Sequence, residues 1–155
     1  MSLTNKHLAS GLATKISGLR AASFAALVML LIEYGLGIWV SLYADLPASA
    51  KGKGILAAFG SAVTAGPAGL TLHALFGVAL LAAGISGVVR AALLRRPQLI
   101  AIAVAALVAL VIAALDGARF VGDTTNGSSF GMALFAGVAV SCYATILFIV
   151  TPTRV

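Results

Sequence analysis

The most constraining feature of this sequence is a set of four long apolar stretches separated by short polar segments. A helix needs about 20 residues, with a range of roughly 17–25, to cross the ~30 Å hydrocarbon core of a bilayer. All of the stretches are of that length, and the third is the shortest. They cover residues 21–44, 68–89, 97–115 and 130–150. We therefore expect an all-α protein, a four-transmembrane-helix bundle forming a single domain of residues 1–155.

The composition supports a membrane protein over a soluble one. Hydrophobic residues make up 61% of the chain and charged residues only 9%, whereas a soluble domain has roughly 25% charged residues. The net charge of +6 arises from Lys and Arg at the ends of the apolar stretches, not from a patch interleaved with aromatic residues. We therefore expect the lipid bilayer as the environment and no nucleic-acid partner.

The distribution of Lys and Arg predicts the orientation of the bundle. The positive-inside rule places the connections richer in these residues in the cytoplasm. The N-terminal segment, the connection between the second and third stretches and the C-terminal segment carry Lys6, Lys15, Arg20, Arg90, Arg95, Arg96 and Arg154, and the opposite side carries Lys51, Lys53 and Arg119. We expect a multi-pass protein of the plasma (inner) membrane, up-down-up-down, with both termini cytoplasmic.

The N-terminal segment, residues 1–20, is predicted to form a cytoplasmic interfacial helix that leads into the first span. Its apolar residues recur at helical spacing, at Leu8, Leu12, Ile16 and Leu19. A cleaved signal peptide is the alternative, because Ala48-Ser49-Ala50 resembles a cleavage site. The apolar region of a signal peptide is only ~7–15 residues long, which favours an uncleaved span.

The connections between the spans are unequal in length. The outer loop, residues 45–67, is the longest, and the spacing of its apolar residues Ile55, Phe59 and Val63 predicts a short amphipathic helix over 54–65. Pro97 suits the first turn of the third span. The turn before the fourth span is expected at Asn126-Gly127.

Small and polar residues at helical spacing mark one face of each span. Lipid supplies no hydrophobic force between helices, so small residues that let backbones approach are favoured where helices pack. We expect these faces to turn inward. They comprise Glu33, Gly37 and Ser41; His73, Gly77, Leu80, Gly84 and Gly87; Ala105, Ala109, Ile112, Asp116 and Arg119; and Ala133, Gly137, Ser141 and Ala144.

Four ionisable residues of these faces form the candidate polar cluster: Glu33, His73, Asp116 and Arg119. Glu33 is the most informative, because a charge at the centre of a membrane helix costs roughly 2.5–3.5 kcal/mol on insertion scales. It must face the bundle, pair with another group or be protonated, and its role is either to fix helix register or to form a proton, ion or ligand site. At 1.5 Å per residue, Glu33 is expected about 10 Å deeper than His73.

The stretch Leu72-His73-Ala74-Leu75-Phe76-Gly77, with Gly117-Ala118-Arg119-Phe120, resembles small bacterial four-helix integral membrane proteins that carry an LHxxxG-type motif at the start of the second helix. The placement of His73 is also distantly similar to that in b-type membrane cytochromes, which implies haem b binding. Met132 is expected at a similar depth on the fourth span and is the candidate second axial ligand.

The sequence offers little material for catalysis. Its one cysteine is Cys142, and no phosphate-binding glycine loop or metal-ligand spacing is present, so we expect neither enzymatic activity nor a metal site nor a cofactor. The expected function is that of a small accessory subunit of other membrane proteins, or of a homo-oligomer. The alternatives are a membrane redox module that binds haem b or quinone through His73, and proton-coupled transport involving Glu33.

Overall fold

The structure is a computed structural model that describes the backbone of residues 3–150 and the side chains of residues 10–48 and 50–150. The side chains of Lys6 and His7, and all of Arg154, lie outside this part. The elements are α1 (Leu3–Tyr43), the 3-10 turn η1 (Ala48–Ala50), α2 (Ile55–Thr64), α3 (Ala68–Leu93), α4 (Pro97–Asp123) and α5 (Asn126–Ile149). Four helices are long and apolar enough to cross a membrane, namely α3, α4, α5 and residues Ser10–Tyr43 of α1.

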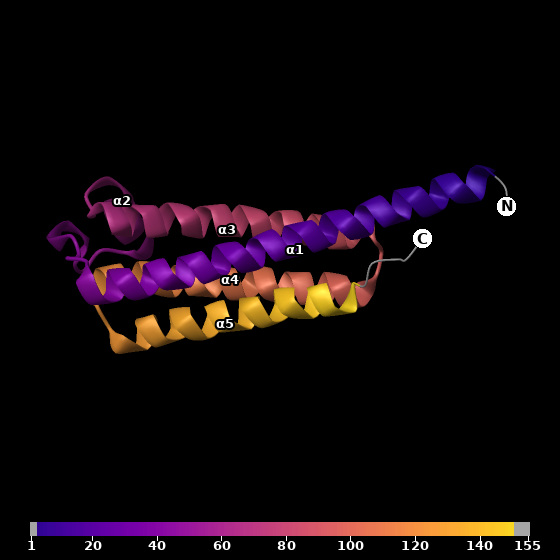
Figure 1. The fold of residues 1–155 in the computed structure, drawn as a ribbon. Coiled ribbons are helices and arrows are strands. Elements are labelled where there is room, and N and C mark those ends of the chain that lie inside the picture. Colours follow the sequence, from indigo (N-terminus) through magenta and orange to yellow (C-terminus); the bar gives the residue numbers. More distant parts are fainter. Residues whose placement is uncertain (1–2, 151–155) are drawn as a thin grey trace.

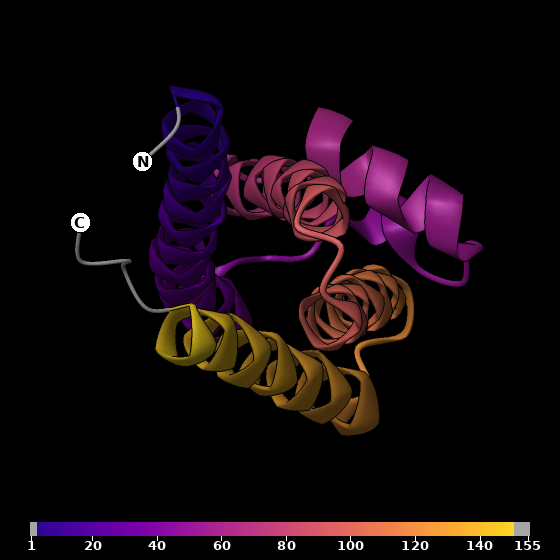
Figure 2. The same cartoon turned by 90° about the vertical axis from the view of Figure 1, so that its right-hand side faces the viewer.

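The four long helices form a bundle in which each helix contacts two others. In the described residues α1 packs on α3, α3 on α4, α4 on α5, and α5 on α1 (Figure 2). Figure 1 shows these helices side by side along one direction, with the start of α1 and the end of α5 toward the same end of the bundle and α2 at the other. The expected all-α bundle with four apolar helices is confirmed.

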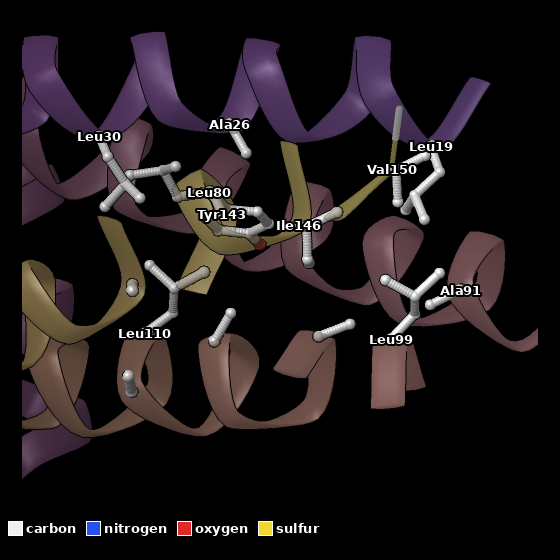
Figure 3. Packing of buried hydrophobic residues seen from close by; sticks show 14 residues of the cluster. Leu19, Ala26, Leu30, Leu80, Ala91, Leu99, Leu110, Tyr143, Ile146 and Val150 are labelled. Carbon is white, nitrogen blue, oxygen red and sulfur yellow. The ribbon is translucent and has the colours of Figure 1, made fainter. Parts of the chain in front are cut away.

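The core of the bundle is built from apolar side chains of all four long helices. Leu19, Ala26 and Leu30 of α1 meet Tyr143 and Ile146 of α5 there (Figure 3). On the outside, large apolar side chains such as Phe24, Leu31, Phe130 and Phe148 are exposed. An apolar surface of this kind suits lipid and would be a liability in water.

The first helix is continuous over 41 residues. The expected division at residue 20, between an interfacial segment and the first span, is not seen, because nothing between Leu3 and Tyr43 breaks the helical hydrogen bonds. No proline is present there, and the glycines lower helix propensity by only ~1 kcal/mol each. Figure 1 shows that the N-terminal part of α1 extends beyond the other helices.

The tight connection between α3 and α4 agrees with the sequence, but the one between α4 and α5 does not. Pro97 occupies the first turn of α4, as predicted. The turn expected at Asn126-Gly127 is wrong, because α4 continues to Asp123 and Asn126 already begins α5. Thr124, with φ 52°, reverses the chain in the left-handed region, a conformation that glycine and asparagine adopt more readily than threonine does.

The outer-loop helix lies where it was expected. It spans Ile55–Thr64 and packs on α3 and α4. Its buried residues are Ala58 and Ala62, flanked by the partly buried predicted stripe. The hydroxyl of Thr71 on α3 donates to the carbonyl of Ala62 at 3.1 Å, which ties the end of this helix to the bundle.

The predicted inward face of α5 is wrong at three of its four positions, while Ala133 is partly buried and lines the cavity described below. Gly137, Ser141 and Ala144 are exposed, and the buried face carries Ala139, Tyr143 and Ile146 instead. The large Tyr143 side chain reaches the backbone of α3, where Gly84 and Gly87 leave room for it: a Cβ at Gly84 would lie 3.6 Å from its hydroxyl. The glycines of α3, and not Gly137 of α5, therefore make room for the Tyr143 side chain.

Candidate functional site

The helices α1 and α3 approach closely because each presents glycines to large side chains of the other. A Cβ at Gly37 on α1 would lie 3.3 Å from Cε1 of His73, and a Cβ at Gly77 on α3 would lie 3.5 Å from Oε1 of Glu33. Nearer the end of α1, Trp39 covers Gly69 so tightly that a Cβ there would overlap the indole. Residue numbers fall along α1 as they rise along α3, so the two helices are antiparallel at this contact.

Glu33 and His73 are in direct contact across these two helices. Oε1 of Glu33 and Nδ1 of His73 lie 2.9 Å apart, and the side chains are 14% and 18% exposed. The contact has the distance of an ion pair but not the alignment of a hydrogen bond. The other carboxylate oxygen, Oε2, is buried without a hydrogen-bond partner among the described residues.

The expected ~10 Å difference in depth between Glu33 and His73 is wrong. That estimate aligned the predicted ends of the two spans. In the structure Gly69, near the start of α3, lies beside Trp39, so the last turn of α1 extends past α3. This offset, together with the length of the glutamate side chain, brings the carboxylate to the imidazole.

The pair lines a cavity of about 310 Å³ in the half of the bundle nearer α2. All four long helices and α2 contribute to its wall, which is mainly apolar. Its polar lining includes Glu33, His73, Ser41 and Ser129. Ligand sites in proteins are typically apolar clefts of ~300–1,000 Å³ with a few placed polar groups, and this cavity is of that kind.

Asp116 and Arg119 form a separate pair within α4. Nη1 of Arg119 donates to Oδ1 of Asp116 at 3.3 Å, and the arginine side chain is 55% exposed. Neither residue lines the cavity. The carboxylate of Asp116 instead packs against α5 at Gly131, where a Cβ would overlap it. The four residues of the predicted polar cluster are thus placed as two pairs.

Met132 lines the same cavity as His73, from the opposite helix pair. Its sulfur lies close to α4, since a Cβ at Gly117 would be 3.3 Å from it. The imidazole and the thioether are both ligand types found for haem iron. No group of three or more His, Cys, Asp or Glu residues suited to a metal ion occurs in the part of the chain that the structure describes.

Ser129 also lines the cavity, and the sequence analysis did not single it out. The signal that could have found it is its position three residues before Met132, on the same side of α5. Its hydroxyl adds a small polar group to the wall that α5 presents.

Comparisons with known proteins return no matching family model, no matching curated protein and no matching solved structure. The resemblance to four-helix membrane proteins with an LHxxxG-type motif stays a prediction.

Proposed function

We propose that this chain is a multi-pass plasma-membrane protein without enzymatic activity that binds a small organic ligand inside its bundle, at the Glu33–His73 pair. The proposed arrangement in the membrane is up-down-up-down with both termini cytoplasmic, as the distribution of Lys and Arg predicts. The observation that carries the ligand proposal is the contact of an ionisable pair at the wall of an apolar cavity.

The energetics of the pair favour a role beyond helix packing. A buried ion pair stabilises a fold little, because desolvation of both charges offsets their attraction, and apolar replacements are often neutral or better. Ionisable groups inside a membrane accordingly mark functional sites by default. Gly37 and Gly77 would allow α1 and α3 to pack closely without any charged group. The Glu33–His73 pair is therefore better explained by binding of a ligand in the cavity.

The direct test is recovery of a bound molecule. Protein purified in mild detergent would be extracted with organic solvent and the extract analysed by mass spectrometry. We expect one compound at a near-stoichiometric ratio in the wild type, and at least a tenfold lower amount in Glu33→Gln and His73→Ala. Asp116→Asn is the matched control, because this carboxylate does not line the cavity. Equal recovery from all variants, or no compound in the wild type, would contradict the proposal.

Haem b is the second candidate ligand, favoured by the presence of His73 and Met132 in one cavity. A metal-binding histidine usually has its other ring nitrogen held by a carboxylate or carbonyl. Glu33 lies beside Nδ1, which leaves Nε2 as the nitrogen that would hold the iron. When bound, haem would supply one-electron chemistry.

An absorption spectrum separates the haem candidate from other ligands. Protein from cells given a haem precursor would be recorded oxidised and after dithionite. A stoichiometric Soret band that is lost in His73→Ala supports haem. A wild-type protein that is folded but colourless would exclude haem as the ligand and leave the proposal of another organic ligand.

The orientation can be tested with single cysteines. In a Cys142→Ser background, Lys51→Cys should react with a membrane-impermeant maleimide added to intact cells. Arg95→Cys, in the opposite tight turn, should react only after the cells are opened. The reverse pattern would overturn the proposed orientation.

The expected role as an accessory subunit or homo-oligomer agrees with the exposed face of α5. Gly137 has no neighbour within 4 Å of a Cβ placed on it, and Ser141 one turn later is exposed as well. Small residues at this spacing let a second membrane helix approach closely. Crosslinking between Gly137→Cys copies in membranes would test a homo-oligomer, with the exposed Val89→Cys on α3 as the control.

A further inference from the structure

Both α1 and α5 line the cavity that contains the Glu33–His73 pair. In the half of the bundle away from α2 these helices are in contact: Leu19 and Ala26 belong to the same buried cluster as Ile146, and the guanidinium of Arg20 donates to the carbonyl of Val150. Figure 2 shows α5 running away from α1 toward its orange end. The helices α1 and α5 are therefore farther apart at the level of the cavity.

Residues that α1 contributes to the cavity wall are also partly exposed. Tyr34 and Ile38 lie on the same face of α1 as Arg20, yet they are 50% and 47% exposed and they line the cavity. On α5 the corresponding wall has Ser129, Ala133 and Ala136. The exposed cavity residues of α1 and the small cavity residues of α5 mark this side as the candidate opening toward lipid.

We propose that the ligand is a lipid-soluble molecule of the hydroquinone type, with a hydroxylated ring and an apolar tail. It reaches the cavity from the bilayer between α1 and α5 and donates a hydrogen bond to Oε2 of Glu33. This inference rests on the proposed function and specifies the ligand class and its route.

The chemistry of the head group follows from the unpaired oxygen. An ionised carboxylate can only accept hydrogen bonds. Oε2 is buried and has no donor among the described residues, and a buried group left without a partner costs about 1–3 kcal/mol. A ligand hydroxyl supplies the missing donor. A hydroxyl is uncharged, so the molecule can dissolve in lipid, whereas an ammonium donor would have to be desolvated first.

The head group would lie where three glycines line the cavity. Gly37, Gly77 and Gly117 line it from three different helices, and none presents a Cβ. The side chains of His73, Glu33 and Met132 lie over these glycines. The ring would therefore lie beside these three side chains. The tail would then lie in the opening, against Tyr34 and Ile38.

The head-group test compares two probes that differ only in the donor. Decylhydroquinone and its dimethyl ether would be titrated calorimetrically into wild-type protein in nanodiscs. We expect the ether to bind roughly tenfold more weakly or worse, because it leaves Oε2 of Glu33 unpaired. Equal affinities would overturn the head-group assignment without any variant being needed.

Variants then assign the effect to Glu33. Glu33→Met keeps the length of the side chain and removes both oxygens, so it should abolish the preference for the hydroquinone. Asp116→Asn, outside the cavity, should keep it. A preference that persists in folded Glu33→Met would overturn the role of Oε2. If this variant does not fold, Glu33→Gln, which replaces one oxygen by a donor, should still reduce the preference.

The route is tested by lipid dilution and by blocking the opening. For a ligand taken from the bilayer, affinity expressed as a mole fraction of lipid stays constant as the lipid-to-protein ratio is varied. Ala136→Phe should slow association at least fivefold, whereas Val138→Phe, which does not line the cavity, should not. Affinity that instead follows the aqueous concentration, with unchanged rates in Ala136→Phe, would overturn the lateral route.

Failure of this inference is distinguishable from failure of the proposed function. Recovery of a compound that depends on Glu33 and His73, combined with equal binding of the two probes, would remove only the hydroquinone assignment. If no compound is recovered and neither probe binds, both proposals are overturned.

Discussion

The indole of Trp39 on α1 lies against the backbone of Gly69 on α3, with no room for a Cβ at position 69. This contact is four residues from His73 on α3 and six from Glu33 on α1. It therefore fixes the register of the two helices at the site. The packing of Trp39 on Gly69 thus aligns the two helices so that Glu33 contacts His73.

Gly69→Ala should destabilise the protein by about 1–3 kcal/mol, because the new methyl group must displace a stiff aromatic ring. The free energy of unfolding can be measured by SDS titration in mixed micelles. Gly35→Ala is the matched control: position 35 is also helical, but nothing lies within 4 Å of its Cβ. It should be neutral or stabilising by up to ~1 kcal/mol. Equal effects of the two substitutions would contradict the contact.

A double-mutant cycle with Glu33→Gln and His73→Gln should show strong coupling. Because both side chains are more than four-fifths buried, we expect an interaction energy of about 1–3 kcal/mol, within the range found for residues of one network. The same cycle on Asp116 and Arg119 should give ~1 kcal/mol or less, because Arg119 is 55% exposed. Additive effects at Glu33 and His73 would show that the pair does not form.

Tyr143→Phe should leave stability unchanged or raise it by up to ~2 kcal/mol. The hydroxyl of Tyr143 is buried in the core and has no hydrogen-bond partner among the described residues, so its removal relieves a desolvated polar group. The readout is again the free energy of unfolding. A loss of more than ~1 kcal/mol would indicate that the hydroxyl is hydrogen-bonded in the protein.

Thr124→Gly should stabilise the protein by about 1 kcal/mol. Thr124 holds a left-handed backbone, with φ 52°, and this conformation costs an L-residue with a Cβ roughly 1–2 kcal/mol. Gly52→Ala provides the converse test, since Gly52 has φ 68° and no steric neighbour, and it should destabilise by a similar amount. In thermal denaturation we expect Thr124→Gly to raise the midpoint temperature and Gly52→Ala to lower it. A change in the same direction for both substitutions would refute this prediction.

The apolar pattern predicted the helices well, because transmembrane length and hydrophobicity are properties of each segment alone. The start of α3 at Ala68 and of α4 at Pro97 agree with the sequence to the residue. The end of α4 was missed by eight residues. Asp116 and Arg119 pair with each other inside the helix, which continues past them to Asp123.

The site was predicted as one cluster of four ionisable residues, whereas the structure places them as two pairs. Glu33 and His73 stood out because ionisable groups are rare in apolar helices, but their contact depends on the offset between α1 and α3. That offset is fixed by Trp39 and Gly69, which are far apart in the sequence. The inward face of α5 was missed because small residues mark close packing equally well on a core face and on an outer one.

The unbroken course of α1 has a mechanical consequence. At 1.5 Å per residue its 41 residues form a rod about 60 Å long, twice the ~30 Å thickness of the hydrocarbon core. Glu33 is some 35 Å along this rod from Ser10, with no hinge between them. A lipid surface or protein that tilts or twists the first turns of α1 would therefore also move the carboxylate of Glu33. The carboxylate would shift relative to the imidazole of His73, which is held on α3.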